Sequence, residues 1–314
     1  MQFRKNWPAL IGIAIATILL PISYLSREAA ISARKAQASS AMLQLAETHL
    51  VTADKRIEEA IQTHFGSIVS LFNDARSNAS EFAVSALGWS SKWRIVADAV
   101  PFTRGDRHEE FLKKQFESQV LSGSKLERAV EQSVVEFLAE IRSVESKMLV
   151  DLRADMESIS KDYNIETWRA EEIQLHFDEA LARASRIAGI DLQSNIHSQI
   201  VSIVVGEVLT QVAIRLGVSA GILGTGAASG WVTLGVGVVV GIIIDQIVMT
   251  IWNQWSDPKA DLVNVLTKQL SMMQGFICYG DETTQGLLQH FEIIAKTRSQ
   301  LRRAAVLEDR KSVV

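Results

Sequence analysis

Apolar residues recur at alternating steps of four and three through much of the N-terminal half of the chain. This spacing lines residues up along one side of a helix and is typical of coiled coils and helical bundles. The clearest seam consists of Ile61, Phe65, Ile68, Phe72, Ala75, Ala79, Phe82 and Ala86. A similar seam from Leu43 to Ile57 is offset by one residue, which predicts local unwinding near Ala60 or two facing partners.

Two further helices are expected in the same region. One should run from about Lys125 to Ser160 with an apolar stripe from Val130 to Ile159, and another should begin at an Asn164 cap and end near Gly189. Matching stripes can form an antiparallel bundle or a coiled coil, and the spacing alone leaves both open. Because no convincing alternating strand pattern occurs, the predicted fold class is all-α, with residues 27–198 as a helical bundle or coiled-coil domain.

The first of two hydrophobic segments lies at the N-terminus. The 21 residues between Lys5 and Arg27 carry no charge, which is long enough for a helix to cross a bilayer. Arg4 and Lys5 also precede an apolar core in the manner of a signal peptide, but no small-x-small cleavage site follows Leu25 directly. Residues 1–26 are therefore predicted to be an uncleaved transmembrane anchor.

The second hydrophobic segment, residues 199–252, combines two patterns. Residues 199–216 are apolar apart from a line of Glu207, Gln211 and Arg215, which predicts an amphipathic helix on or against a membrane. Residues 216–244 then carry no charge and hold eight of the 18 glycines, and 20 residues separate Trp231 from Trp252. This length suits a span with interfacial aromatics at its edges. The aromatics assigned to membrane interfaces are Trp7, Trp231, Trp252 and Trp255.

Small residues and one acid give this second segment its candidate chemistry. Gly237 and Gly241 are spaced as in a glycine zipper, so that two membrane helices could approach closely. Asp245 would lie inside the membrane near the Trp252 end, where a carboxylate is costly unless it is protonated, paired or facing water. The three residues are thus candidates for helix packing or a polar path. Alternatively, Asp245 marks the headgroup boundary of a span that begins near Leu216.

The C-terminal tail, residues 253–314, should form two amphipathic helices. Ser256, Asp257 and Pro258 make a good helix start, and the second helix, from about Thr283 to Val306, ends in many Lys and Arg residues. These charges could complement a helix end or touch anionic lipid. With two single spans, both termini would lie in the cytoplasm and residues 27–198 outside it. The expected location is a bacterial inner membrane.

Composition argues against several classes of function. A net charge of −4 and the absence of basic runs interleaved with aromatics give no footprint for nucleic acid. Cys278 is the sole cysteine, so this chain alone can build neither a disulfide nor a thiolate metal cage. Glu172, His176 and Glu179 share a helix face that could hold a metal, but a solvated acidic face is the favoured interpretation. No cofactor, metal or enzymatic activity is expected.

These patterns predict a non-enzymatic integral membrane protein whose helical domain mediates assembly or scaffolding. Its partners would be the lipid bilayer and either further copies of the chain or another helical protein. The alternative is a pore-forming or channel protein that uses the glycine-rich segment. In outline, long helices around a glycine-rich hydrophobic hairpin resemble α-helical pore-forming toxins, although this likeness is one of architecture and not of residues.

Overall fold

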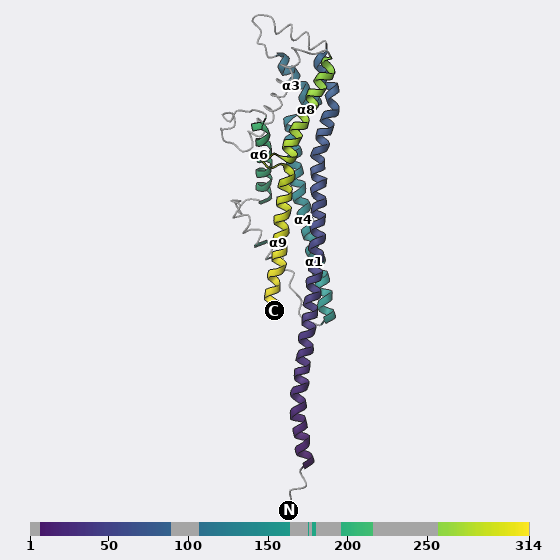
Figure 1. Ribbon diagram of the computed structural model, residues 1–314, viewed down its shortest axis with the longest axis vertical. Helices are drawn as coiled ribbons and strands as arrows, with labels where there is room; N and C mark the ends of the chain where they lie inside the picture. The colour runs from purple at the N-terminus through teal and green to yellow at the C-terminus, as the bar shows by residue number, and fades with distance from the viewer. Residues whose placement is uncertain are drawn as a thin grey trace, which may run out of the picture. The chain divides into compact units, whose positions relative to one another are not determined.

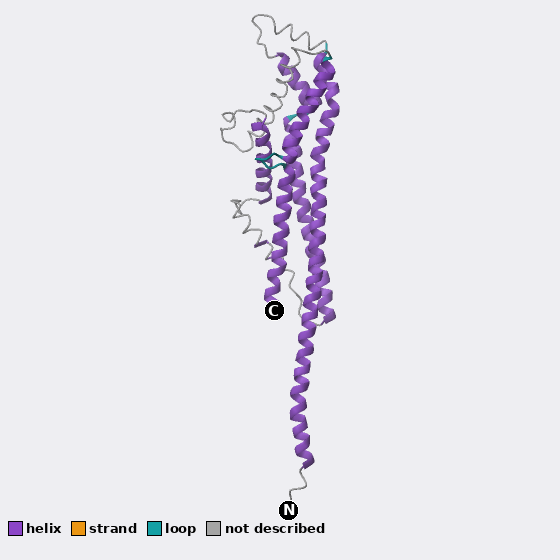
Figure 2. Cartoon of the chain, viewed as in Figure 1, coloured by secondary structure: helices purple, strands orange, loops and turns teal. Residues whose placement is uncertain are grey.

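The described part of the chain is almost entirely helical. The computed structural model describes residues 7–88, 107–163, 196–215 and 257–313, together with Leu175, Asp178 and Glu179, and the side chains discussed below lie between residues 27 and 306. Its helices are α1 (Trp7–Leu87), α3 (Arg107–Gln119), α4 (Gly123–Tyr163), α6 (Ile196–Arg215), α8 (Pro258–Tyr279) and α9 (Leu287–Val313). No β-strand occurs in these ranges, so the all-α prediction is confirmed for them (Figure 2).

Helix α1 buries the seam that the heptad spacing predicts. Every position of the seam between Ile61 and Ala86 is buried, and so are Ala46, Leu50, Ala53 and Ile57 upstream. The one-residue offset near Ala60 does not interrupt the helix, because α1 is unbroken over 81 residues. Instead Ala60 and Ile61 are both buried, so the core-facing side widens there and absorbs the one-residue offset.

Helix α4 likewise places its predicted stripe inside. The buried members are Val130, Val134, Phe137, Ile141, Val144, Met148, Leu152 and Met156. Ile159 is half-buried, and the neighbouring Ser160 is buried in its place at the end of the stripe. The third helix expected from Asn164 to Gly189 lies outside the described residues, apart from Leu175, Asp178 and Glu179.

The chain divides into two compact units, and three helices contribute to both. Unit 1 comprises residues 1–53, 145–179 and 302–314, and unit 2 comprises residues 54–144 and 180–301. Each unit therefore combines parts of the predicted domain 27–198 with parts of the C-terminal tail. Figure 1 shows the helices by label and colour along the chain.

In unit 2, α8 and α9 run one after the other in the same direction. Tyr279 packs edge-on against Phe65 of α1, while Gln274, earlier in α8, accepts a hydrogen bond of 2.6 Å from Arg76, later in α1. This order makes α8 antiparallel to α1. In α9, the ring of Phe291 stacks on the ring of Phe137 in α4, with 4.2 Å between the ring centroids. Figure 1 shows α8 leading onward into α9 and not folding back on it.

A short loop, residues 280–286, separates α8 from α9 (Figure 2). Gly280 and Gln285 pair across its neck, and the Asp281 carboxylate accepts hydrogen bonds from the backbone and hydroxyl of Thr283 and from the hydroxyl of Thr284. Gly280 has φ 70° and ψ −152°, a backbone conformation essentially restricted to glycine. A Cβ on Gly286 would overlap the backbone of Tyr279 and Gly280. The two glycines let the chain leave and rejoin the helical line at one point.

The N-terminus of α8 follows the predicted helix start. Asp257 is the N-cap, and its carboxylate accepts a hydrogen bond of 3.3 Å from the backbone N–H of Ala260. Pro258 occupies the first turn, where its missing N–H removes no helical hydrogen bond. The apolar side of α8 is buried through Leu262, Leu266, Leu270 and Met273, as expected from their spacing.

The membrane expectations fall largely on residues that the structure does not describe. Among the residues that it does describe, no helix is both long enough and apolar enough to cross a bilayer. The predicted span from Val232 to Ile251 lies outside them, and so do the side chains of the predicted anchor, residues 1–26. The backbone of that anchor is helical from Trp7, where α1 begins.

Substituting alanine at Gly286 should destabilise unit 2. The added Cβ meets backbone and not a flexible side chain, so the loop neck must open, at a cost of about 1–3 kcal/mol. Gly275→Ala in α8 is the matched control, because a Cβ there meets nothing within 4 Å and alanine favours helix by about 0.8–1 kcal/mol. Thermal unfolding followed by circular dichroism should lower Tm for the first variant and raise it for the second. Equal effects would contradict the described neck.

Candidate functional site

The structure does not describe the membrane residues singled out in the sequence. Gly237, Gly241, Asp245, Trp231, Trp252 and Trp255 all lie outside the described residues. Trp7 is the first residue of α1, and its side chain is not described. Helix packing or a polar path at these positions therefore stays a prediction. The described chemistry lies instead in charged side chains that join one helix to another.

Unit 1 contains a buried ion pair between α9 and α4. Nη1 of Arg302 donates to Oε1 of Glu145 at 2.6 Å, and the two side chains are only 1% and 5% exposed. Arg302 is among the largest fully buried side chains of the described residues. A charge-assisted hydrogen bond of this length is strong, and it recovers part of the cost of taking both charges out of water.

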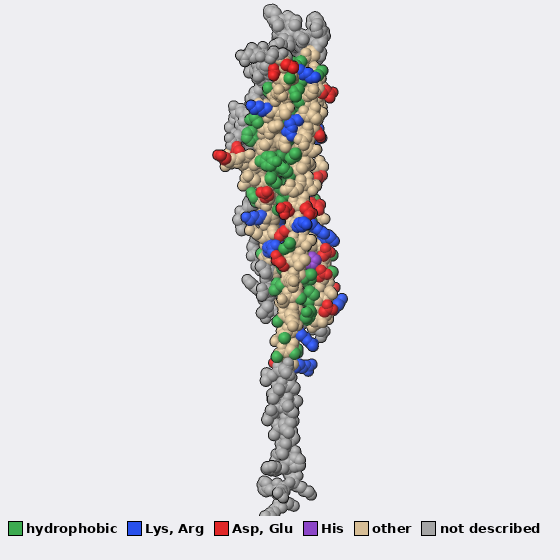
Figure 3. All heavy atoms as spheres, turned by 45° about the vertical axis from the view of Figure 1, so that its right-hand side comes forward, with side chains coloured by type: hydrophobic (Ala, Val, Ile, Leu, Met, Phe, Trp, Pro, Cys, Tyr) green, Lys and Arg blue, Asp and Glu red, His purple; other side chains and the backbone are tan. Residues whose placement is uncertain are grey.

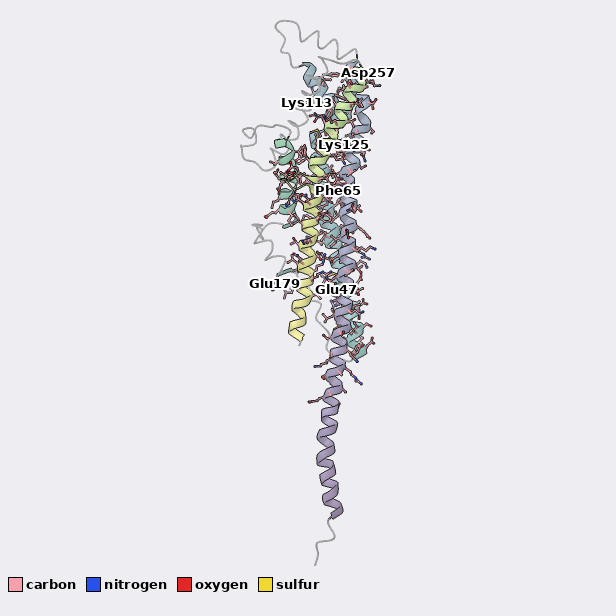
Figure 4. All side chains as sticks on the ribbon, viewed as in Figure 1. Glu47, Phe65, Lys113, Lys125, Glu179 and Asp257 are labelled. Atoms are coloured by element: carbon pink, nitrogen blue, oxygen red, sulfur yellow. The ribbon has the colours of Figure 1, made fainter. Side chains whose placement is uncertain are left out.

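Two more exposed pairs flank this contact in unit 1. Nη1 of Arg303 donates to both carboxylate oxygens of Glu47 on α1, at 2.6 and 2.9 Å. Nε2 of His49 on α1 lies 2.9 Å from Oδ2 of Asp155 on α4. Figure 4 labels Glu47 on its helix. We name Glu47, Glu145, Arg302 and Arg303 the charged cluster; it links α1, α4 and α9 within unit 1.

The charged cluster fixes which turns of the helices meet. Apolar seams tolerate a shift by a heptad, since one apolar contact replaces another, whereas a buried charge that slips past its partner is left unpaired. Sequence reasoning assigned these arginines to a helix end or to lipid, and the structure corrects that assignment. The spacing places Arg302 on the buried side of its helix, because it lies four residues after Arg298 and three before Ala305, which are both buried, but it does not identify Glu145 as the partner.

Histidines of unit 2 also face acids on other helices. Nδ1 of His64 on α1 lies 3.5 Å from Oε2 of Glu136 on α4, and Nε2 of His290 on α9 lies 3.9 Å from Oε2 of Glu207 on α6. Nearby, Ser133 donates from its hydroxyl to the backbone oxygen of His64 at 2.8 Å. This hydroxyl therefore ties α4 to α1 and does not engage an imidazole.

The candidates for metal binding find little support in the described residues. No group of three His, Cys, Asp or Glu side chains gathers there in a way that could hold a metal ion. Glu172 and His176 of the predicted helix face lie outside these residues, while Glu179 is described and exposed (Figure 4). Cys278 is fully buried, and burial raises the pKa of its thiol to about 12, so it stays protonated at neutral pH.

Helix α6 corresponds to the predicted amphipathic helix, but it packs on protein. Its apolar side contacts α8, and Val204, Val205, Val208, Leu209 and Val212 are buried. Glu207, on the predicted polar line, is partly exposed and faces α9. Neighbouring helices of unit 2 therefore cover its valine-rich side, while Ile203 of the same helix is 52% exposed. The expectation that this helix lies on or against a membrane stays a prediction.

Breaking the buried pair should be costly, whereas replacing both partners should be much less so. Arg302→Met leaves Glu145 charged and buried, and we expect it to lower the free energy of unfolding by about 3–5 kcal/mol. The double variant Arg302→Met with Glu145→Leu should recover a large part of that loss. Glu157→Gln breaks the exposed Arg153 pair on α4 and should cost below about 0.5 kcal/mol. Urea unfolding of the four proteins measures these differences, and equal losses in the single and double variants would contradict the pairing.

Comparisons with protein families, with curated proteins and with solved structures find no match for this chain.

Proposed function

We propose that this chain is a non-enzymatic integral membrane protein whose helical bundle mediates assembly or scaffolding at the membrane surface. The observation that carries the proposal is the continuity of α1. The uncharged residues between Lys5 and Arg27 belong to the same unbroken helix as Glu47 and His49 of unit 1. Because α1 is unbroken, an N-terminal part embedded in a membrane would hold the helices that pack on α1 close to that membrane.

The described polar side chains form structural contacts between or within helices, which favours a role in assembly over an enzymatic one. Arg302, Glu145 and Ser133 each join one helix to another, and the hydroxyls of Thr48 and Thr52 donate to their own helix backbone. On the face shown in Figure 3, Lys, Arg, Asp and Glu side chains are interspersed along the described helices, as on a solvated surface. Such a bundle offers rigid helical faces to a second copy or to a helical partner.

The packing also constrains the topology. Within unit 1, Arg302 and Arg303 of the C-terminal helix contact Glu145 and Glu47, and within unit 2, α6 contacts α8. These contacts support a topology in which residues on both sides of 216–256 share one side of a membrane. That topology differs from the one expected from two single spans, which puts the C-terminus opposite residues 27–198. We propose a cytoplasmic N-terminus, with the bundle and the C-terminal helices together on the other face of a bacterial inner membrane.

Membrane association is tested by alkaline carbonate extraction of native membranes. The full chain should stay with the membrane pellet, and release into the soluble fraction would end the proposal. Reconstituted into lipid vesicles loaded with a fluorescent dye, a scaffold should leave the dye inside. Release of dye would favour the pore-forming alternative, and Asp245→Asn should then change its rate, because that carboxylate is the candidate for a polar path.

The side of the membrane is tested by labelling single introduced cysteines in intact cells with an impermeant maleimide. Val150→Cys in α4 and Lys259→Cys in α8 are both exposed positions, and Val150 is 67% exposed. Both variants should be labelled equally before cell lysis. The parent chain should stay unlabelled, because Cys278 is buried and its pKa is raised to about 12. Labelling of only one variant would restore the single-span topology.

A further inference from the structure

We propose that His290 is an acid-sensitive latch for α6: while its ring is neutral, α6 stays docked against α8 and α9 with Glu207 beside the ring, and protonation of the ring as the pH falls releases α6. The latch is a property of unit 2 and does not depend on the proposed membrane function. It lies between α6, whose valine-rich side is buried, and α9, which follows the loop 280–286.

The geometry places one titratable ring at the junction of α9 with α6. His290 is buried, and its Nε2 has no hydrogen-bond partner among the described residues. Oε2 of Glu207 is 3.9 Å from this nitrogen, beyond hydrogen-bond distance, and the Glu207 side chain is exposed. Neutral imidazole tolerates this position, whereas a charged imidazolium would lack most of its solvation.

Position in the helix also disfavours the charged form. His290 lies in the first turn of α9, where its backbone N–H donates to the oxygen of Gly286. The N-terminal end of a helix carries partial positive charge, which opposes a cation there. The pKa of His290 is accordingly lowered from its ordinary value, first by burial, while the Glu207 carboxylate partly offsets the shift.

The charged groups around the ring come from several elements. Helix α6 brings Glu207, and the last part of α8, from Leu270 to Tyr279, has no acidic or basic residue, its titratable groups there being Cys278 and Tyr279. Asp281 and Glu282 lie in the loop. On α4 and α1, Glu136 and His64 pair with each other at 3.5 Å, next to the Phe137 ring that stacks on Phe291. Among the described residues, Glu207 is thus the charged group that shifts the pKa of His290.

The direction of the pH effect follows from linkage. When α6 is released, His290 gains water and its pKa returns toward the ordinary value of about 6.5. The docked form, with the lowered pKa, binds fewer protons than the released form at mildly acidic pH. Docking is therefore at full strength above about pH 6.5 and weakens as the pH falls below that value toward the lowered pKa. Release would expose Val204, Val208 and Leu209 to solvent.

Hydrogen–deuterium exchange of the full chain tests the latch directly. Backbone amides of residues 198–212 should lose protection between about pH 7.5 and about pH 5, after correction for intrinsic exchange, by up to about tenfold for each unit by which the pKa of His290 is lowered. Peptides from the α4 core in unit 2 should keep their protection. Unchanged protection of α6 down to that pH would overturn the proposal.

Two substitutions with opposite effects identify the residues responsible. His290→Gln removes the titration, so protection of α6 should no longer depend on pH, whereas Glu207→Gln removes the offsetting charge and should deepen the acid-induced loss. His64→Gln is the matched control, since it removes another histidine of unit 2 and should retain the loss. A loss that persists in His290→Gln, or vanishes in His64→Gln, would overturn the proposal.

Should His290→Gln fail to fold by circular dichroism, the surface substitution Glu207→Gln still decides. A loss of α6 protection that Glu207→Gln leaves unchanged or makes smaller would overturn the latch. Titration of the His290 ring by nuclear magnetic resonance provides a second measurement. A ring pKa at or above the ordinary value in the folded chain would also overturn it. Neither result bears on carbonate extraction, so the latch and the membrane proposal fail independently.

Discussion

Burial of one continuous seam along α1 is the constraint on which both units depend. In unit 1 the seam is built largely from small side chains such as Ala38, Ala46 and Ala53, and in unit 2 it is built from Phe65, Phe72 and Phe82. Small residues let neighbouring backbones approach closely, while aromatic rings fill wider spaces between helices. Every other described helix packs either on this seam of α1 or on a helix that itself packs on the seam.

Charge gives the seams a specificity that apolar contacts lack. Leucine at the positions of Arg302 and Glu145 would avoid the desolvation penalty of two buried charges. It would, however, allow α9 to shift along α4, because apolar contacts specify the register less strictly. The opposite arrangement holds at His290, where a neutral ring sits close to an acid without a hydrogen bond.

Helical periodicity was enough to predict the fold class, the seams of α1 and α4 and the cap of α8, because burial on one side of a helix leaves a regular mark at steps of three and four. It could not predict that α6 packs on α8, since an apolar helix side looks alike whether protein or lipid covers it. Nor did it predict the Arg302–Glu145 pair, because pairing between distant helices leaves no local pattern. Gly237, Gly241 and Asp245, which were predicted to lie in a membrane, are outside the described residues.

The loop between α8 and α9 has a consequence for how this chain can change length. Residues 280–286 form a loop whose two ends meet at Gly280 and Gly286. The heptad register of α9 is therefore independent of the heptad register of α8. Residues added at the loop tip, around Glu282, would lengthen the excursion without rotating Phe291 or Arg302 away from their partners. The same insertion inside α1 would turn half of its seam toward water. Tolerance to insertion is thus concentrated at one place along the C-terminal helices.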